Sequence, residues 1–339
     1  MSGEVSSLRV KDIGEQGLLE RLQRFCPSDI VGDDAAVMPG PEAGQALVVT
    51  TDVLVDEVHF SDRTTSPEDM GWRAAAVNLS DLAAMGASPL GITVGLSVSG
   101  DTSVSWVEEV YQGLTCCLQH YNTPIVGGDV VRSSIVSLAI TAFGQVFPNR
   151  TIRRSAAKIE DAIVVTGIHG ASRAGLELLL KPELGQNLSD VERLHLIKAH
   201  QRPKPRLDVL PILWKILDPQ SKIPIAGMDS SDGLADAVLQ LCRASGVGAR
   251  IERTAIPLPS ALIQLVPPQL AIDWALYGGE DFELVLCLPP VLAEALVEQL
   301  GEGTAVIGNI TTGNQVWLTD SSGTYANELL ALSQGFQHF

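Results

Sequence analysis

Two kinds of apolar segment alternate along this chain, and each kind predicts a different element. Short runs rich in Val, Ile and Leu predict strands at 46–52, 91–98, 124–126, 136–146, 162–166, 223–228, 281–288 and 303–310. Longer segments with apolar residues three to four positions apart predict helices at 67–85, 104–121, 171–180, 231–245 and 291–300, and another that ends at Leu217. The alternation lacks the strict strand-helix-strand repeat of an all-parallel sheet.

The length of the chain predicts two domains. At 339 residues it exceeds what one hydrophobic core usually supports, and 45% hydrophobic residues are enough to fill two cores. The basic stretch 149–158 is a candidate linker, because a new strand is predicted to begin at Ala162.

The charge balance narrows the class of partner. Lys and Arg together number 23 and Asp and Glu number 40, which gives a formal charge of −17. Binding to a nucleic-acid backbone needs a basic surface, so we expect no nucleic-acid partner. An acidic enzyme can still bind phosphate groups when metal ions supply the positive charge.

The sequence also predicts a location. No stretch reaches the roughly eighteen apolar residues of a membrane span, and residues 1–12 lack the apolar core of a signal peptide. The cysteines are odd in number and form no Cys-x-x-Cys pair, which favours reduced thiols over disulfides or a zinc site. They are Cys26, Cys116, Cys117, Cys242 and Cys287. We therefore expect a cytoplasmic protein with no membrane contact.

Short acidic segments, beside glycine or after a strand-like run, recur along the chain. Hard cations such as Mg2+ take oxygen ligands and bridge protein carboxylates to substrate phosphates. Scattered carboxylates that the fold could gather therefore indicate a polynuclear metal site and phosphate chemistry. The segments are Gly32-Asp33-Asp34, Thr50-Thr51-Asp52, Asn78-Leu79-Ser80-Asp81, Gly127-Gly128-Asp129 and Asp229-Ser230-Ser231-Asp232-Gly233.

Each of these motifs also has an ordinary structural interpretation. The segments 32–34 and 127–129 are typical of tight turns whose aspartates satisfy backbone donors. The recurrence of an acid at predicted strand ends, at Asp52, Asp129 and Asp229, favours a metal site instead. Small neighbours would let phosphate oxygens approach the backbone closely.

Asp81 lies in a predicted helix that is otherwise apolar. A solvated helix face would explain it. Alanines at 74–76, 83 and 84 leave little bulk around it, however, so we expect the helix to pack closely. A half-buried carboxylate needs a partner, and a cation is the simplest one. Asn78 shares the face of Asp81 at i,i+3 spacing.

Two later motifs allow two interpretations each. The segment 229–233 is either an ordinary helix start, with Ser231 or Asp232 near the cap, or a phosphate site at a helix amino terminus with a metal beside it. Gly278-Gly279-Glu280-Asp281-Phe282-Glu283 poses the same choice, and Glu283 is treated as structural. The absence of a Gly-Lys dipeptide excludes a Walker-type phosphate loop.

Taken together, these segments resemble the thiamine-monophosphate kinase family of the aminoimidazole-ribonucleotide-synthetase-like superfamily. The resemblance runs nearly end to end, and its most specific parts are the block 78–86 and the segment 278–281. The matching motifs are Gly32-Asp33-Asp34-Ala35-Ala36, Thr51-Asp52, His59-Phe60, Ala76-Val77-Asn78-Leu79-Ser80-Asp81-Leu82-Ala83-Ala84-Met85-Gly86, Gly127-Gly128-Asp129, Ser231-Asp232-Gly233-Leu234, Gly278-Gly279-Glu280-Asp281 and Gly335-Phe336-Gln337-His338-Phe339.

The resemblance implies a fold, a reaction and partners. It implies an α+β chain in which residues 1–150 form an ATP- and metal-binding domain, whose mixed sheet is the core of a homodimer. Residues 151–339 would form an α/β domain that completes the active site. The implied reaction is the ATP-dependent phosphorylation of thiamine monophosphate to thiamine diphosphate, with several Mg2+ ions and with K+ as a further candidate.

The resemblance also implies roles for residues of this chain. The implied metal ligands are Asp33, Thr50, Thr51, Asp52, Asp81, Asp129, Asp229 and Asp232. The implied ATP contacts are Tyr111, Gly128, Arg154 and Ser231, and the implied contacts to thiamine phosphate are His59, Glu280 and Phe336. The chain departs from the family pattern at Val130 and Val131, where threonines are common, and at Thr50, where serine is common. Arg153 lies beside Arg154, so which of the two arginines contacts ATP stays open.

Charge sets the expected mechanism. The acceptor phosphate and the γ-phosphate of ATP are both anionic, so metal ions and Arg154 would have to screen their repulsion during an in-line transfer. A phosphate monoester is already largely ionised near neutral pH. We therefore expect no aspartate to act as a general base.

Other assignments remain open from the sequence. A selenophosphate synthetase would carry a reactive cysteine near its amino terminus, and Cys26 lacks a glycine-rich context with a lysine. A hydrogenase-maturation protein would end near a cysteine, whereas this chain ends at Phe339. An aminoimidazole-ribonucleotide synthetase would lack the segment 278–281 and the Phe336 ending. A non-catalytic nucleotide or cation binder is the alternative from another class.

Overall fold

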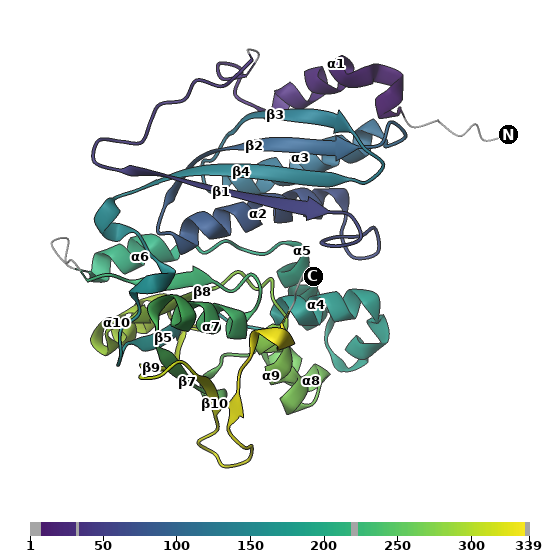
Figure 1. Ribbon diagram of the computed structural model, residues 1–339. Helices are drawn as coiled ribbons and strands as arrows, with labels where there is room; N and C mark the ends of the chain where they lie inside the picture. The colour runs from purple at the N-terminus through teal and green to yellow at the C-terminus, as the bar shows by residue number, and fades with distance from the viewer. Residues whose placement is uncertain (1–7, 32–33, 218–222, 336–339) are drawn as a thin grey trace. The chain divides into compact units, whose positions relative to one another are not determined.

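The computed structural model describes residues 8–31, 34–217 and 223–335. The chain divides into two compact units, Met1–Leu82 with Pro89–Gln145, and Ala83–Ser88 with Val146–Phe339. Each unit contains its own β-sheet (Figure 1). Within the described ranges, no helix is both long and apolar enough to span a membrane.

The first unit contains a four-stranded sheet in the order β1-β4-β2-β3. Its strands are β1 (Ala46–Val55), β2 (Ser88–Val98), β3 (Ile125–Arg132) and β4 (Ser137–Val146). β2 and β3 are parallel, with Gly95 opposite Asp129. Burial alternates along β2 and β4, because successive side chains of a strand point to opposite faces. Val94, Leu96 and Ile140 are therefore buried on one face.

The helices α2 (Pro67–Ala84) and α3 (Val104–Gln119) lie along this buried face (Figure 1). They approach each other closely at two glycines. A Cβ atom on Gly71 would lie 1.9 Å from the carbonyl oxygen of Val110, and one on Gly113 would lie 1.8 Å from that of Glu68. This close packing confirms the expectation for the alanine-rich helix. The helix α1 (Val10–Leu22) and the 3-10 turn η1 (Gln23–Phe25) pack beside α3.

The opposite face of this sheet carries apolar side chains that the chain leaves in solvent. Leu47 and Val49 of β1 are each 53% exposed, Val53 is 48% exposed, and Val131 of β3 is also 48% exposed. A patch of this kind is typical of a surface that a partner covers.

The second unit contains a seven-stranded mixed sheet in the order β11-β10-β7-β9-β5-β8-β6. The strand β8 is antiparallel to both β5 and β6. The carboxyl ends of β5 and β6 therefore share one edge with the amino end of β8. The strands are β5 (Ala162–Val165), β6 (Ala226–Asp229), β7 (Gly248–Glu252), β8 (Leu284–Leu288), β9 (Ala305–Thr311), β10 (Val316–Thr319) and β11 (Glu328–Leu329).

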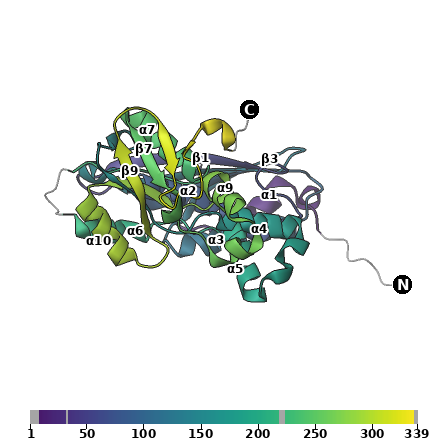
Figure 2. The ribbon, with the colours of Figure 1, turned by 90° about the horizontal axis from the view of Figure 1, so that it is seen from below.

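Helices cover both faces of this second sheet (Figure 2). Along β5, Ile163 and Val165 belong to the core beneath α7 (Leu234–Ser245). Ala162 and Val164 belong to the core beneath α6 (Val209–Ile216) and α10 (Pro290–Leu300). A strand buried on both faces reads as a continuous apolar run, as this one does. The helices are α4 (Ala171–Leu180), α5 (Asp190–Gln201), α6 (Val209–Ile216), α7 (Leu234–Ser245), α8 (Ser260–Leu265), α9 (Pro268–Tyr277) and α10 (Pro290–Leu300). Short 3-10 turns are η2 (Pro148–Arg150), η3 (Arg154–Ala156), η4 (Pro182–Asn187), η5 (Arg253–Ala255) and η6 (Leu332–Gln334).

Two strand predictions that bear on the site are wrong at their ends. The strand predicted at 124–126 runs on through the two glycines to Arg132, because parallel pairing with β2 holds this segment extended. The strand predicted from 281 begins at Leu284. Glu280 and Phe282 have φ angles of 60° and 53°, which a strand does not allow.

The helix predicted from 231 begins at Leu234. Its N-cap is Gly233, which provides no side-chain cap, and Ser231 and Asp232 lie just before it, near the cap as expected. The hydroxyl of Ser231 instead donates to Asp229 Oδ1 at 3.0 Å.

Candidate functional site

A cavity of about 440 Å3 in the first unit is formed by α1, η1 and the edge strand β3. Leu19 and Leu22 come from α1, Cys26 follows η1, and Tyr111 comes from α3. The residues 125–130 of β3 form the opposite wall. The cavity therefore brings together two of the implied ATP contacts, Tyr111 and Gly128, with one implied metal ligand, Asp129.

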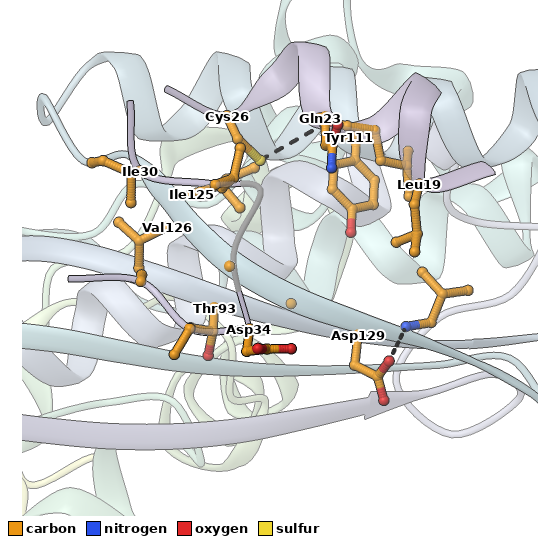
Figure 3. A pocket seen from close by; sticks show the side chains of 17 residues that line it. Leu19, Gln23, Cys26, Ile30, Asp34, Thr93, Tyr111, Ile125, Val126 and Asp129 are labelled. Atoms are coloured by element: carbon orange, nitrogen blue, oxygen red, sulfur yellow. Dashed lines mark hydrogen bonds between the residues drawn. The ribbon is translucent and has the colours of Figure 1, made fainter. Parts of the chain in front are cut away.

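The two ends of this cavity differ in chemistry. In Figure 3 the ring of Tyr111 and the thiol of Cys26 lie at one end. The carboxylates of Asp34 and Asp129 lie at the other end. The ring centroids of Tyr111 and Phe25 are 5.7 Å apart. Burial raises the pKa of the Tyr111 hydroxyl. Asp34 is a lining residue that the sequence argument passed over in favour of its neighbour Asp33, which lies outside the described residues.

A second group of implied ligands lies where β1 meets α2. The hydroxyl of Thr50 donates a hydrogen bond to Asp81 Oδ2. Asp81 is half-buried, as expected. Asp52 lies two positions along β1 from Thr50, so it faces the same side of the sheet. Thr51 faces the other side, where its hydroxyl lies 2.9 Å from that of Thr141.

Two acids do not lie at strand ends as the sequence predicts. β1 continues past Asp52 to Val55, and β3 continues past Asp129 to Arg132. Only Asp229 is the last residue of its strand. The strands extend because neighbouring strands pair with them, which the short apolar runs do not reveal.

The imidazole of His59 is held by the turn after β1. The N–H of Val55 donates to His59 Nδ1 at 3.1 Å, so the neutral ring carries its proton on Nε2. The buried Arg73 of α2 donates to the carbonyl oxygen of His59 at 3.3 Å. Glu57, two residues earlier, has a φ angle of 62°, which tightens the turn.

The implied ligands do not form one ready-made metal cage. Among residues 8–31, 34–217 and 223–335, no group of three or more His, Cys, Asp or Glu side chains is placed to hold a metal ion. The donors that do meet, a threonine hydroxyl and carboxylates, are hard oxygen ligands of the type that Mg2+ takes. Mg2+ usually completes its shell with water and substrate phosphates, so a sparse protein set fits that ion.

In the second unit, the implied residues that the structure describes lie at one edge of the sheet. Asp229 ends β6 and is 3% exposed, while Asp232 is exposed in the turn that follows. Burial, and then the charge of Asp232, raise the pKa of Asp236, whereas the Arg154 charge lowers it. The charge of Arg154 therefore acts on this acidic turn. The hydroxyl of Ser245 donates to the carbonyl oxygen of Arg154 at 2.9 Å and so fixes the main chain of Arg154.

The segment 278–283 turns sharply against the 229–233 turn. Gly279, Glu280 and Phe282 all have positive φ angles, of 67°, 60° and 53°. The N–H of Glu280 donates to the carbonyl oxygen of Ser231 at 2.7 Å. Two non-glycine residues in the left-handed region indicate a backbone that its surroundings hold in place.

Buried histidines support this segment, and sequence reasoning missed them. His200 of α5 is 3% exposed, and its Nδ1 lies 3.5 Å from Glu280 Oε2 and 3.2 Å from the hydroxyl of Ser172. His169 is fully buried, and burial lowers its pKa to about 4. Its Nδ1 donates to the carbonyl oxygen of Gly167 at 3.2 Å, and Ser230 donates to its Nε2 at 3.1 Å. Neither histidine has a motif spacing that would single it out.

Asp281 ties the same segment to a helix. Its carboxylate accepts from the main-chain N–H groups of Gly170 at 2.7 Å and Ser172 at 2.9 Å, at the start of α4. Burial raises the pKa of Asp281 to about 7. The two N–H groups lower this pKa, whereas the negative charges of Glu283 and Glu280 raise it further.

Glu283 has a structural role, as expected. It accepts hydrogen bonds from Arg206 and, at 2.7 Å, from the hydroxyl of Thr166. Burial raises its pKa, and the charge of Arg206 opposes that rise. The last implied substrate contact, Phe336, lies outside the described residues.

Comparison with known proteins agrees with this architecture. Residues 32–146 match the family model of the AIR synthase related protein, N-terminal domain, and residues 158–330 match that of its C-terminal domain. The thiamine-monophosphate kinase of Synechococcus elongatus is 54% identical over 336 residues, which cover 99% of each chain.

Solved structures agree as well. The crystal structure of thiamine-monophosphate kinase from Stenotrophomonas maltophilia K279a has a TM-score of 0.76 and 32% identity, over 90% of this chain and 95% of that one. The structure of AaThiL complexed with AMPPCP and TMP has a TM-score of 0.70 and 31% identity, over 96% of this chain and 98% of that one. The resemblance seen in the motifs is confirmed over both units, and this α+β chain belongs to the thiamine-monophosphate kinase family of AIR synthase related proteins.

Proposed function

We propose that this chain transfers the γ-phosphate of ATP to thiamine monophosphate and so forms thiamine diphosphate. The observation that carries the proposal is the 54% identity to a thiamine-monophosphate kinase over nearly the whole chain. A related chain has been solved with AMPPCP, an analogue of ATP, and with TMP. The geometry of both units supports the assignment.

ATP would bind in the cavity beside β3. Its nucleoside end suits the apolar end at Leu19, Leu22 and Tyr111, because such pockets bind mainly through apolar and aromatic contact. Its phosphates would then extend toward Gly128 and Asp129. A Cβ atom on Gly128 would lie 2.2 Å from the carbonyl oxygen of Val94, so only glycine keeps this wall in place.

Mg2+ would bind through the carboxylates and hydroxyls described above, with K+ as a further candidate. In the first unit the candidates are Asp33, Thr50, Asp52, Asp81 and Asp129, together with the main chain of Thr51. In the second unit they are Asp229 and Asp232. Mg2+ bound there would neutralise phosphate charge and lower the repulsion between the two substrates.

The chain's own groups would orient the transfer. Arg154 would stabilise charge on the transferring phosphoryl group, with Arg153 as the alternative. Ser231 would contact ATP, and His59 could donate from Nε2 to the acceptor phosphate. Glu280 and Phe336 would contact the thiamine part. No aspartate needs to accept a proton, because the acceptor phosphate is already ionised near neutral pH.

We further propose that two copies pair through the open face of the four-stranded sheet. Leu47, Val49, Val53 and Val131 supply the apolar surface that a second copy would bury. A cytoplasmic location is part of the same proposal. All five cysteines are free thiols, as is usual in a reducing compartment.

Product analysis tests the proposal. The protein is incubated with thiamine monophosphate, ATP and Mg2+, and thiamine diphosphate and ADP are quantified by chromatography. The proposal predicts equal amounts of the two products and their loss on chelation of the metal. ATP binding without either product would instead favour a non-catalytic binder.

A further inference from the structure

The strand β6 ends in an exchange of hydrogen bonds at Ser230. This fully buried residue lies opposite Glu283, one step beyond the paired residues Asp229 and Leu284. Two residues placed in this way in an antiparallel sheet can exchange two main-chain bonds. The first is present, because the N–H of Ser230 donates to the carbonyl oxygen of Glu283 at 2.8 Å. The second is replaced, because the carbonyl oxygen of Ser230 accepts from the N–H of Gly233 at 3.0 Å, where the chain turns.

The side chain of Ser230 takes over the bond that its carbonyl group gives up. The hydroxyl oxygen accepts from the N–H of Glu283 at 3.2 Å. β6 therefore stays joined to the segment before β8 up to Ser230, although the chain already turns away there. The hydroxyl proton in its turn needs an acceptor, because a buried donor without a partner destabilises the fold.

His169 supplies that acceptor. Its Nε2 lies 3.1 Å from the hydroxyl oxygen of Ser230, and its Nδ1 lies 3.2 Å from the carbonyl oxygen of Gly167. A carbonyl oxygen can only accept, so Nδ1 carries the proton of the neutral ring and Nε2 accepts from Ser230. Burial lowers the pKa of His169 to about 4, which keeps the ring neutral near neutral pH. We call the bonds that link Gly167, His169, Ser230 and Glu283 the His169 relay.

The other neighbour of β8 shows the same exchange with a different acceptor. Thr166 follows β5 directly and lies opposite Leu284. Its N–H donates to the carbonyl oxygen of Leu284 at 3.1 Å, and its hydroxyl oxygen accepts from the N–H of Leu284 at 2.8 Å. There the hydroxyl donates to the carboxylate of Glu283 at 2.7 Å. The His169 relay ends on a neutral imidazole instead, which adds no negative charge close to Asp229 and Asp232.

The His169 relay acts on the residue between an implied metal ligand, Asp229, and an implied ATP contact, Ser231. The hydroxyl of Ser231 donates to Asp229 Oδ1 at 3.0 Å. Asp229 is 3% exposed and closely packed, so its carboxylate can move little unless the main chain moves with it. Partners that orient the ligands of a metal commonly change its affinity about tenfold to a hundredfold.

We propose that His169 is a positioning residue for Mg2+ at the 229–233 turn, because its bond from Ser230 fixes the main chain that carries Asp229. This inference rests on the proposed function, which makes Asp229 a ligand of Mg2+. His169 touches neither the metal nor the substrates in this role, and Ser230 transmits its effect.

Binding of Mn2+, used as a paramagnetic substitute for Mg2+, tests the relay without turnover. Free Mn2+ is measured by electron paramagnetic resonance in the presence of the full-length protein and AMPPCP. Binding that is lost in Asp229→Asn identifies the ion that the 229–233 turn holds. His169→Leu removes the acceptor, His169→Gln can keep one in its amide oxygen, and Ser230→Ala removes the hydroxyl.

Thr319→Val is the matched control for loss of one hydroxyl. The hydroxyl of Thr319 donates to the carbonyl oxygen of Ile251 at 3.0 Å, and its strand β10 lies toward the opposite edge of the same sheet from β6. Thermal unfolding checks that each variant is folded. If His169→Leu does not fold, Ser230→Ala and His169→Gln decide the outcome.

The relay predicts that His169→Leu and Ser230→Ala each weaken binding of this Mn2+ about tenfold, whereas His169→Gln stays within about threefold of the wild type. The double variant should lose about tenfold and not a hundredfold, because the two residues act as one unit. In assays of initial rate, excess Mg2+ should restore the rate of each folded single variant. Thr319→Val should bind Mn2+ like the wild type.

Four results overturn the relay. They are unchanged Mn2+ binding in the folded His169→Leu and Ser230→Ala variants, multiplied losses in the double variant, a loss in His169→Gln as large as in His169→Leu, and Mn2+ binding that Asp229→Asn does not reduce.

Binding and turnover separate this inference from the proposed function. If the wild type forms no thiamine diphosphate, the proposed reaction fails, and Mn2+ binding that His169→Leu weakens and His169→Gln preserves still supports the relay. If product forms and the variants leave Mn2+ binding unchanged, the reaction stands and the relay falls.

Discussion

The main-chain N–H of Glu280 donates a hydrogen bond to the carbonyl oxygen of Ser231, with 2.7 Å between nitrogen and oxygen. This bond joins two acidic motifs that are far apart in the sequence. It also fixes Glu280 in a left-handed conformation, beside His200 and the start of β8. The second unit therefore presents Asp229, Asp232 and Glu280 from one edge of its sheet.

The contact between Thr50 and Asp81 predicts a metal-dependent defect in the Asp81→Asn variant. An amide is a weaker ligand for Mg2+ than a carboxylate, so activity should fall and should be partly restored by excess Mg2+. We expect the apparent Mg2+ affinity to drop about tenfold to a hundredfold in a titration of initial rate. Asp69→Asn changes the same helix in the same way and should keep the wild-type Mg2+ dependence. Unchanged activity of Asp81→Asn at every Mg2+ level would refute Asp81 as a ligand.

Adjacent glycines in β3 should respond differently to alanine. A Cβ atom on Gly128 would lie 2.2 Å from the carbonyl oxygen of Val94, in the paired strand β2. On Gly127 it would lie no closer than 3.8 Å, from Thr93 Cγ2. Gly128→Ala should shift the wall of the cavity beside β3 and raise KM for ATP about tenfold, because forced overpacking costs about 1–3 kcal/mol. Gly127→Ala should behave like the wild type, and equal effects of the two substitutions would contradict this account.

The open face of the four-stranded sheet predicts how the chain assembles. If the chain pairs as proposed, Val49→Asp should convert the dimer to monomers in sedimentation experiments, because an unpaired charge buried at an interface costs several kcal/mol. Val291 of α10 belongs to the other unit and is 76% exposed, so Val291→Asp should leave the proposed dimer intact. A Val49→Asp variant that still sediments as a dimer would place the interface elsewhere.

Asp281 predicts a pH dependence of stability. Its pKa is about 7 in the fold, above its usual value of 3.8, so the folded chain holds a proton that the unfolded chain releases. The contribution of this group is therefore complete below about pH 4 and is lost as the pH rises to about 7, by at most about 1.4 kcal/mol per pH unit. Above pH 7 it stays constant.

Calorimetry of the Asp281→Asn variant checks this sign. The wild type should lose thermal stability relative to Asp281→Asn between pH 4 and pH 7, and the difference should then level off. Asp320 is an exposed residue whose pKa the Ser322 hydroxyl lowers, so Asp320→Asn should not change this window. A constant difference between the wild type and Asp281→Asn from pH 4 to pH 8 would show that Asp281 titrates normally.

The sequence predicts the long periodic elements well, because their pattern is local. The helix predicted at 67–85 is α2 (Pro67–Ala84), and the close packing inferred from its alanines is present at Gly71 and Gly113. The sequence did not predict α1, because this helix has few apolar residues and Gly14 interrupts it with a φ angle of 66°. Without α1, the cavity beside β3 would lack one wall.

Long-range contacts explain what the sequence could not predict in the site. The positive φ angles at 279, 280 and 282 follow from bonds to Ser231 and to the start of α4, and no local pattern encodes them. His200 meets Glu280 across eighty positions of sequence. The acids at 52 and 129 were expected at strand ends, yet pairing with neighbouring strands extends β1 and β3 beyond them.

One measurement tests the central claim most directly. ATP labelled in its γ-phosphate is mixed with thiamine monophosphate, Mg2+ and the protein, and the label is followed by phosphorus NMR. Transfer of the γ-phosphate predicts that the label appears in the terminal phosphate of thiamine diphosphate, in step with ADP. Label that appears only in inorganic phosphate, or AMP formed in place of ADP, would contradict the account.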